Sequence, residues 1–245
     1  AERHHRRLET MLSVGKGLIV NSSATRDELL AYASERGVAV PPCAVALLAP
    51  ARLPEPNRDR PMAKPYFVVL GTIEPRKNHL LLLHVWRQLV AELGESAPQL
   101  VVIGQRGWEC EQVVDLLDRC LALKGHVTEL PRCDDRELAT WLTHAQALLF
   151  PSFIEGFGMP LVEALTLGLP VLASDLPVFR EIAGDLPVYL DPLDGPAWHR
   201  TVRDFMQQNS PERQTQIARM AGYTAPTWEQ HFAVIEDLLR AIDVG

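Results

Sequence analysis

Between Tyr66 and Leu190 the chain alternates short apolar runs with longer segments of helical spacing, and this alternation constrains the fold most strongly. The runs are almost continuously hydrophobic, as in strands buried on both faces of a parallel sheet. The pattern therefore predicts an α/β fold, with a doubly wound, Rossmann-like parallel sheet. The expected strands are 66–70, 100–103, 127–130, 147–150, 171–173 and 188–190, and the expected helices between them are 79–93, 109–123, 134–144, 161–167 and 178–182.

The N-terminal part predicts a smaller set of elements. Residues 17–21 and 44–49 have the apolar composition of short strands. Residues 22–35 have the spacing of a helix, in which Thr25 and Glu28 are placed as a capping box. We therefore expect one strand, one helix and a second strand before the regular alternation begins.

Prolines mark a boundary at residues 50–65, where five of them stand among charged residues. The tail, residues 197–242, has a helical pattern that is interrupted at Ser210-Pro211 and at Ala225-Pro226. These breaks divide the chain into three expected parts. They are the end of a preceding domain with its linker at 1–60, the α/β domain at 61–225, and a C-terminal helix at 226–245.

Composition and charge exclude several classes of protein. The 245 residues include 24 basic and 31 acidic side chains, and the net charge of −7 argues against non-specific nucleic-acid binding. No apolar run reaches the length of about 18 residues that a membrane span needs. The N-terminus is polar and basic, without the pattern of a signal peptide, so we expect a cytoplasmic protein. Because the chain does not begin with Met, we expect a piece of a longer protein.

A glycine-rich loop follows the predicted strand that ends at Phe150. Gly156 and Gly158 allow positive φ angles and a close approach of the backbone to a ligand. Pro160 suits the start of a helix, whose free N–H groups and dipole favour an anion. Glu155 in the loop and Glu163 in the helix add two carboxylates, which accept hydrogen bonds from sugar hydroxyls.

Two cations follow another strand at the same predicted edge of the sheet. Arg76 and Lys77 come after a turn that contains Gly71 and Pro75. A cation pair beside a helix start can compensate the charge of a diphosphate. Spacing alone leaves a solvated charge pair ahead of a helix equally open. Loops that follow parallel strands converge at one edge, where such sheets bind ligands.

The two glutamates carry a resemblance to a known family. Glu155 and Glu163, with Gly-Phe-Gly-Met-Pro between them, resemble the E-x7-E signature of retaining, nucleotide-sugar-dependent glycosyltransferases with the GT-B fold. The resemblance continues in residues 71–79, 102–108 and 167–174, and it covers roughly residues 66 to 190. It implies that 61–225 is the donor-binding, C-terminal half of a GT-B fold. Most of the acceptor-binding domain would then be missing, with residues 1–60 as its remnant.

The resemblance also implies roles for individual residues. Lys77 and Arg76 would hold the donor diphosphate. The family often has Arg where this chain has Thr72, which leaves the second phosphate ligand open, and we favour Arg76. Glu163 would bind the ribose, and Glu155 would lie near the transferred sugar. The expected catalytic residues are Glu155, Lys77 and Arg76, and the expected donor-binding residues are Gly71, Thr72, Arg106, Leu130, Gly156, Phe157, Gly158, Met159 and Glu163.

Tryptophan, histidine and cysteine side chains also bear on the site. Trp108 either packs on the core at the start of a helix or faces the nucleotide base, and core packing is the favoured reading. Apart from His4-His5, no histidines have ligand-like spacing, and there is no Asp-x-Asp motif. The four cysteines form no Cys-x-x-Cys pair, as expected for reduced thiols. We therefore expect no metal and no cofactor besides the nucleotide-sugar substrate.

The resulting hypothesis is a retaining glycosyltransferase that uses a nucleotide-diphosphate sugar. The run from Glu74 to Asn78 most resembles mannosyltransferase-like members that build bacterial polysaccharides, which favours GDP-mannose as donor. The expected partners are a carbohydrate or lipid-linked acceptor and the missing N-terminal domain, with no nucleic acid, at the inner face of the membrane. The alternatives are a nucleotide-sugar-binding module without catalysis of its own, and an epimerase or glycogen-synthase-like enzyme on the same architecture.

Overall fold

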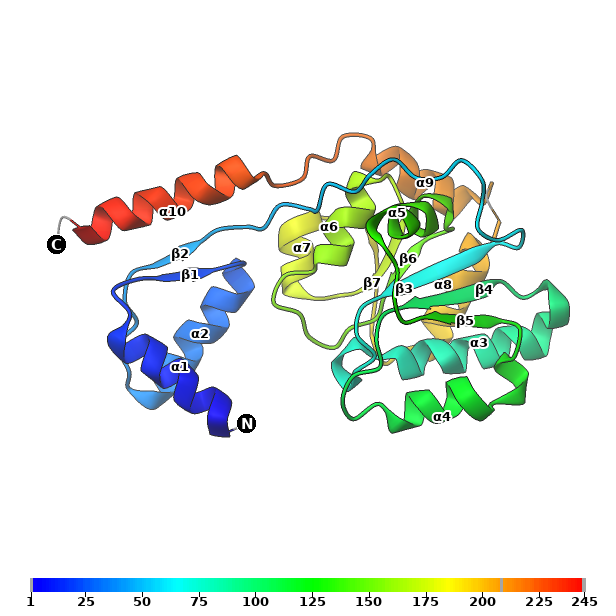
Figure 1. Cartoon of the computed structure of the whole chain (residues 1–245), viewed down its shortest axis with the longest axis horizontal. Coiled ribbons are helices and arrows are strands. Elements are labelled where there is room, and N and C mark those ends of the chain that lie inside the picture. The colour runs from blue at the N-terminus through cyan, green and yellow to red at the C-terminus, as the bar shows by residue number, and fades with distance from the viewer. Residues whose placement is uncertain (1, 208, 244–245) are drawn as a thin grey trace.

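The computed structural model describes residues 2–207 and 209–243, and for residues 2–4 and 243 it describes only the backbone. The chain forms a larger and a smaller lobe joined by two extended segments (Figure 1). The larger lobe contains a six-stranded sheet. Its strands are β3 (Tyr66–Leu70), β4 (Gln99–Ile103), β5 (Val127–Leu130), β6 (Leu148–Phe150), β7 (Val171–Ser174) and β8 (Val188–Leu190).

The sheet has the strand order β5-β4-β3-β6-β7-β8, and each neighbouring pair is parallel. From β3 the chain winds outward through β4 to β5, then returns to β6 and winds the other way. Val68 of β3 pairs with Leu148 of β6 at this reversal. The predicted doubly wound parallel sheet is thus confirmed. Its topological switch point, where such sheets bind ligands, lies between β3 and β6.

Helices cover both faces of this sheet, and the residues of β3 alternate between two hydrophobic cores. Tyr66 and Val68 belong to one core, and Phe67 and Val69 belong to the other. The first core is completed by α5 (Asp135–His144), α6 (Met159–Thr166), α7 (Pro177–Ala183) and α9 (Pro211–Met220), and the second by α3 (His79–Leu93), α4 (Glu111–Arg119) and α8 (Gly195–Phe205).

The smaller lobe is built from both ends of the chain. It contains α1 (Glu2–Val14), β1 (Leu18–Val20), α2 (Ser23–Arg36) and β2 (Cys43–Val45), with β1 and β2 parallel. The C-terminal helix α10 (Trp228–Asp243) lies beside β2 (Figure 1). A ring nitrogen of His231 lies 3.2 and 3.0 Å from the carbonyl oxygens of Ala46 and Leu47. The buried core here is small, with Leu12, Leu29 and Ala33 at its centre.

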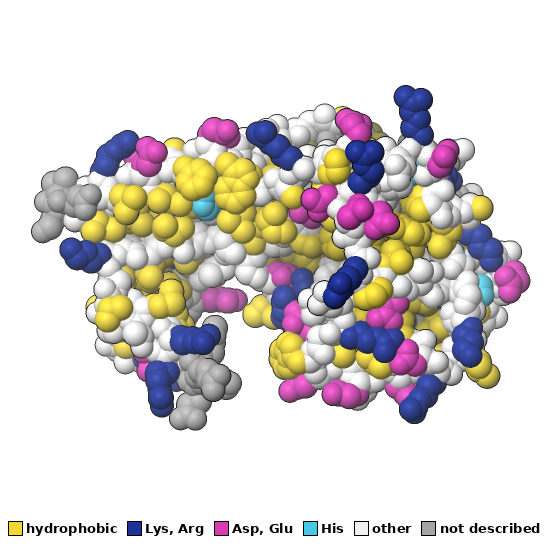
Figure 2. Space-filling view, viewed as in Figure 1, with side chains coloured by type: hydrophobic (Ala, Val, Ile, Leu, Met, Phe, Trp, Pro, Cys, Tyr) yellow, Lys and Arg dark blue, Asp and Glu magenta, His cyan; other side chains and the backbone are white. Residues whose placement is uncertain are grey.

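The start of helix α2 forms hydrogen bonds with the larger lobe. The N–H groups of Ser23 and Ala24 donate to the carboxylate of Glu181 on α7, at 2.7 and 3.2 Å. The hydroxyls of Ser22 and Thr25 both donate to the carbonyl of Gly156, at 2.8 and 3.1 Å. The smaller lobe therefore contacts the glycine-rich loop after β6. Figure 2 shows a hollow between the lobes below this contact.

Several sequence expectations need correction. Helix α1 was not predicted. The second N-terminal strand ends at Val45, because the chain leaves the two-stranded sheet there. Ser22, rather than Thr25, caps α2, since its hydroxyl accepts the N–H of Thr25 at 3.0 Å. Helix α4 is shorter than expected, and the rest of the predicted segment contains a 3-10 turn, Leu121–Leu123.

The expected capping of the helix after β5 is confirmed. Asp134 accepts the N–H of Glu137 at 2.8 Å, and the Glu137 side chain accepts the N–H of Asp134 at 3.1 Å. No helix within the described residues has both the length and the apolar character that crossing a bilayer requires.

Candidate active site

The loops after β3 and β6 lie side by side at the switch point and are tied together by hydrogen bonds. The N–H of Phe153 donates to the carbonyl of Arg76 at 2.8 Å. The Asn78 side-chain amide donates to the carbonyls of Pro151 and Pro192, at 3.2 and 2.9 Å. Asn78 has a φ of 56° between a short 3-10 turn, Pro75–Lys77, and α3. It thereby joins three loops that follow β3, β6 and β8.

A cluster of charges occupies this junction. The Nζ of Lys77 lies 2.6 Å from Oε1 of Glu155, and Nη1 of Arg76 lies 3.0 Å from Oε2 of the same carboxylate. The Ser152 hydroxyl also donates to Glu155, at 2.8 Å. The side chains of Lys77 and Glu155 are only 11% and 8% exposed. The structure thus brings Glu155 together with Arg76 and Lys77, which precede it by 79 and 78 residues, so that the three residues predicted to be catalytic are in contact.

The backbone around Lys77 leaves little room for side chains. A Cβ on Gly71 would meet Cε of Lys77 at 3.4 Å, and the φ of Gly71 is 138°. Gly104, with a φ of 155°, packs so closely on the carbonyl of Gly71 that any side chain would collide with it. Lys77 also lies over the ring of Phe150, with Nζ 5.0 Å from the ring centroid. These contacts hold the ammonium group at the edge of the sheet.

The glycine-rich loop leads into α6 at the same edge. Gly158 precedes the helix with a φ of 118°, and a Cβ there would lie 2.7 Å from the ring of Phe179. Pro160 is in the first turn, as expected. Within the described part of the chain, the N–H groups of Phe157, Gly158 and Met159 have no hydrogen-bond partner. Such groups at a helix start can bind an anion or hydroxyl oxygens.

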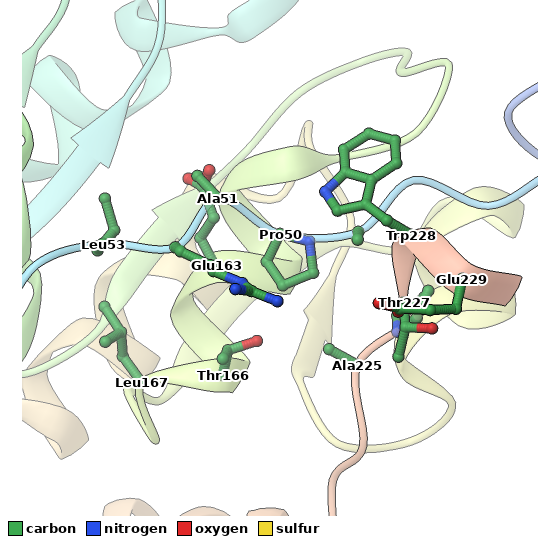
Figure 3. Close-up of a pocket in the computed structure, with 13 residues that line it drawn as sticks. Pro50, Ala51, Leu53, Glu163, Thr166, Leu167, Ala225, Thr227, Trp228 and Glu229 are labelled. Atoms are coloured by element: carbon green, nitrogen blue, oxygen red, sulfur yellow. The ribbon is translucent and has the colours of Figure 1, made fainter. Parts of the chain in front are cut away.

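Glu163 lies farther along α6 and has different surroundings. It accepts a hydrogen bond from the backbone of Ala51, in the segment between the lobes. Burial raises the pKa of its carboxyl group, and nearby Asp135 acts in the same direction. It lines a pocket of about 420 Å³, with Pro50 and Ala51 beside it and Trp228 across from it (Figure 3). Within residues 2–207 and 209–243, no hydrogen bond or ion pair joins Glu163 to the Glu155 cluster.

A second cavity, of about 460 Å³, lies at the carboxyl ends of β3, β4 and β5. Gly71, Thr72 and Leu130, all predicted donor-binding residues, line it. Arg132 and Cys133, in the loop directly after β5, also line it. Burial and three neighbouring carboxylates raise the pKa of Cys133 to about 11, so its thiol stays protonated at neutral pH.

Arg106 follows β4 but does not line this cavity. Its Nε and Nη2 lie 2.8 and 2.7 Å from the two oxygens of Glu129. Its Nη1 and Nη2 lie 3.1 and 2.7 Å from the oxygens of Asp118. These bonds raise the pKa of the Arg106 guanidinium and engage all three of its nitrogens. A donor role for Arg106 stays a prediction, and it would require displacement of these carboxylates.

The preference for core packing of Trp108 was wrong. The residue is 60% exposed and lies in a loop, because α4 begins only at Glu111, after Glu109 with a φ of 50°. The indole N–H donates to Glu74 at 3.0 Å. Glu74 was not singled out in the sequence. Only its position two residues before Arg76 hinted that it might reach that guanidinium.

His79 lies beneath the charge cluster and is 2% exposed. Burial, together with the positive charge of Lys77, lowers its pKa to about 4, so the imidazole is neutral at pH 7. Neither ring nitrogen has a partner within the described part of the chain. Among the described residues, no group of three or more His, Cys, Asp or Glu side chains is placed to hold a metal ion. The side chain of His4, in the predicted His4-His5 exception, lies outside the described residues.

Solved structures of glycosyltransferases share this architecture. The chain is similar to an alpha,alpha-trehalose 6-phosphate synthase from Burkholderia multivorans, with a TM-score of 0.76 and 11% identity over 99% of this chain and 63% of that one. It is also similar to the pneumococcal O-GlcNAc transferase GtfA in complex with UDP and GlcNAc. There the TM-score is 0.69 and the identity 15%, over 99% of this chain and 47% of that one.

Curated proteins show a closer likeness in sequence. The chain is 34% identical over 145 residues to O-antigen chain mannosyltransferase B of Escherichia coli, which covers 59% of this chain and 38% of that protein. It is 32% identical over 171 residues to the serotype-specific mannosyltransferase WbdA of Escherichia coli, which covers 69% of this chain and 20% of that protein. The chain thus spans well under half the length of these relatives.

Residues 55–221 match the family described as Glycosyl transferases group 1. This match extends over the whole six-stranded sheet and includes both loops at the switch point. The chain therefore belongs to the group 1 glycosyltransferase family, and its larger lobe has the architecture of the C-terminal half of a GT-B fold.

Proposed function

We propose that the larger lobe binds a nucleotide-diphosphate sugar and that the intact protein transfers the sugar, with retention of configuration, to an acceptor hydroxyl. The observation that carries this proposal is the cluster of Lys77, Arg76 and Glu155 at the switch point of the sheet. The two cations pair with Glu155, which lies in the loop that leads to the start of α6, and the N–H groups of Phe157 to Met159 there have no partner among the described residues. This combination suits a diphosphate better than any uncharged ligand.

The donor would extend across the carboxyl edge of the sheet. Its diphosphate would lie against Lys77 and Arg76, and its base would enter the cavity at the ends of β3, β4 and β5. Glu163 would accept hydrogen bonds from the ribose hydroxyls. The N–H groups at Phe157 to Met159 would bind the sugar or the phosphate nearest to it. Glu155 would exchange its present cation partners for a hydroxyl of the sugar.

Chemistry would begin with cleavage of the bond between the anomeric carbon and the diphosphate oxygen. The electron pair leaves with the diphosphate, whose charge Lys77 and Arg76 stabilise. The acceptor oxygen attacks the same face of the sugar, and its proton passes to the departing phosphate oxygen. No resident metal or cofactor is required in this scheme, because protein cations and helix N–H groups neutralise the leaving group.

We propose GDP-mannose as donor and a carbohydrate or lipid-linked acceptor in bacterial polysaccharide synthesis. The support is the 32–34% identity to two mannosyltransferases of Escherichia coli, one of them acting on the O-antigen chain by its name. We also propose that the smaller lobe belongs to the acceptor-binding domain, since Ser22 and Thr25 contact the sugar-binding loop at Gly156. The protein would then work at the cytoplasmic face of the membrane.

A second possibility is that this chain alone binds the donor without transferring the sugar. It is favoured by one observation, the match to only 38% and 20% of the two relatives. Residual hydrolysis of the donor would be compatible with it. Sugar transfer to an added acceptor by this chain alone would reject it.

The proposed donor is tested by calorimetric titration with GDP, UDP and ADP, followed by the matching sugar nucleotides. Selective binding of GDP and GDP-mannose is the expected result. Selective binding of UDP would support the proposed donor site but would replace GDP-mannose with a UDP-sugar as the donor. Absence of binding to all three diphosphates would contradict a preformed donor site in this chain.

A further inference from the structure

Glu74 was not expected in the site, but both of its carboxylate oxygens have partners, Arg76 and Trp108. Its side chain is 11% exposed. Its Oε1 lies 2.6 Å from Nε of Arg76, and its Oε2 accepts the indole N–H of Trp108 at 3.0 Å. A carboxylate with so little exposure keeps its charge at low cost only when both oxygens are paired in this way.

The ion pair between Glu74 and Nε of Arg76 restricts how the guanidinium is oriented. Arginine has a long side chain with considerable rotamer freedom, and its planar head presents donors in a fixed fork. Glu74 holds the Nε edge of that fork, and Glu155 holds Nη1 at 3.0 Å. Among the described residues, no bond is made to Nη2. The two carboxylates thereby restrict the plane of the group and leave the Nη2 amino group available to donate to a ligand.

Trp108 is held in place by a backbone pairing between two loops. The N–H of Ile73 donates to the carbonyl of Gln105 at 2.8 Å, and the N–H of Gly107 donates to the carbonyl of Ile73 at 3.0 Å. Gly107 is required there, because a Cβ would lie 2.6 Å from the methyl group of Thr72. The exposed indole is therefore fixed relative to Glu74 by its own backbone, without packing on the core.

We propose that Glu74 is a positioning residue for the diphosphate site, which orients Arg76 toward the ligand and is itself oriented by Trp108. The inference rests on the proposed function and deepens it. It makes the loop after β4 part of the diphosphate site through the chain of contacts from Trp108 to Glu74 to Arg76. Trp108 then has a role that explains its exposure.

A rival explanation of the same geometry predicts the opposite effect on diphosphate affinity. If Glu74 did nothing except offset positive charge, its removal would strengthen the binding of a diphosphate. A purely structural role would weaken folding and the binding of every nucleotide alike. Comparison of a nucleoside diphosphate with its monophosphate separates these cases, because only the former needs the second phosphate contact.

The test is a double-mutant cycle, read out by calorimetric titration with GDP and GMP, or with the diphosphate and monophosphate of whichever base the wild-type chain selects. Glu74→Ala should reduce the preference for the diphosphate about tenfold, because Arg76 loses the close ion pair that orients it and a misplaced phosphate-binding group can cost on the order of 10- to 100-fold. Trp108→Phe should reduce it only about threefold, because it removes one hydrogen bond to Glu74 and leaves the contact between Glu74 and Arg76 in place. In an Arg76→Ala background, Glu74→Ala should have no further effect.

Glu95→Ala serves as the matched control, because this glutamate is 91% exposed and, among the residues that the structure describes, its carboxylate pairs only with Lys64. A stronger preference for GDP in Glu74→Ala would overturn the proposal, as would equal losses of GDP and GMP affinity. Additive effects of Glu74→Ala and Arg76→Ala would also overturn it. If the wild-type chain binds none of GDP, UDP and ADP, the proposed function itself fails, an outcome distinct from failure of the positioning role.

Discussion

Arg76 and Arg106 follow neighbouring strands and are almost equally exposed, at 42% and 39%, yet their surroundings differ. Arg76 pairs with Glu74 and Glu155, which are 11% and 8% exposed, beside the buried Lys77. Arg106 pairs with Asp118 and Glu129, which are 49% and 19% exposed. The first cluster lies at the switch point of the sheet and the second one strand away from it. Burial and position in the sheet, rather than the arginine itself, distinguish the proposed ligand site from the surface ion pairs of Arg106.

Among the substitutions in the two clusters, Lys77→Ala should have the largest effect on GDP affinity. Lys77→Ala removes the most buried cation of the first cluster, and we expect about 100-fold weaker binding of GDP, the upper range for a hydrogen bond to a charged group. Calorimetry provides the measurement, with Lys64→Ala, an exposed surface lysine, as control. Unchanged affinity in a folded Lys77→Ala variant would show that the cluster does not hold the diphosphate.

The buried cluster should also respond to acid through His79. Its folded pKa of about 4 lies below the ordinary value of 6.5, so the unfolded chain binds more protons between these values. Stability from this residue is therefore complete above pH 6.5 and is lost as pH falls toward 4. Between pH 7 and pH 5 the loss should be about 2 kcal/mol.

Urea denaturation of the wild type and of His79→Leu at both pH values measures this contribution. The expected outcome is that the free energy of unfolding falls by about 2 kcal/mol less in the variant, on the same linkage argument. The exposed Arg106 cluster offers the comparison, since Arg106→Ala should leave the wild-type pH dependence of His79 in place. Identical pH dependence in wild type and His79→Leu would contradict the assignment of this imidazole.

Removal of the Glu155 carboxylate, which pairs with Lys77 and Arg76, should change GDP affinity less than Lys77→Ala does and should raise it. Glu155→Gln should strengthen the binding of free GDP about tenfold, because the diphosphate no longer displaces a charge-assisted partner from Lys77. Sugar transfer by the intact protein should fall, since the sugar loses its carboxylate contact. Titration of Glu155→Gln and Glu95→Gln tests this, and weaker GDP binding in the former would count against displacement.

The smallest effect is expected for Arg106. Arg106→Ala breaks exposed ion pairs of the kind that contribute at most about 1 kcal/mol to stability, and it should change GDP affinity less than about twofold. A matched titration beside Arg76→Ala gives the comparison. A loss in Arg106→Ala as large as that in Arg76→Ala would restore the donor-binding role predicted from the sequence and remove the contrast between the clusters.

The sequence predicted the sheet well because strand residues such as Phe67 and Val68 are buried on both faces, which leaves a continuous apolar run. Helix α1 escaped prediction because few of its side chains reach the small core, with Leu12 the main one. Spacing also placed Lys77, Arg76 and Glu155 at one edge. It did not separate Arg76 from Arg106, because that difference arises from carboxylates contributed by distant segments.

Trp108, Glu74 and Glu163 also show that sequence spacing does not reveal contacts between distant segments. A tryptophan ahead of a helix is most simply expected to pack on the core, and only the backbone pairing of Ile73 with Gln105 and Gly107 keeps it outside. The contact of Glu163 with Ala51 depends on the path of an extended connection between lobes, which carries no periodic signal.

The most direct test of the account is a crystal structure of the chain with bound GDP. The diphosphate should lie within hydrogen-bond distance of Lys77 Nζ and the Arg76 guanidinium, with Glu155 withdrawn from both and Glu74 still on Arg76 Nε. A diphosphate bound at Arg106, or in the pocket between Glu163 and Trp228 with the Lys77–Glu155 pair intact, would contradict it.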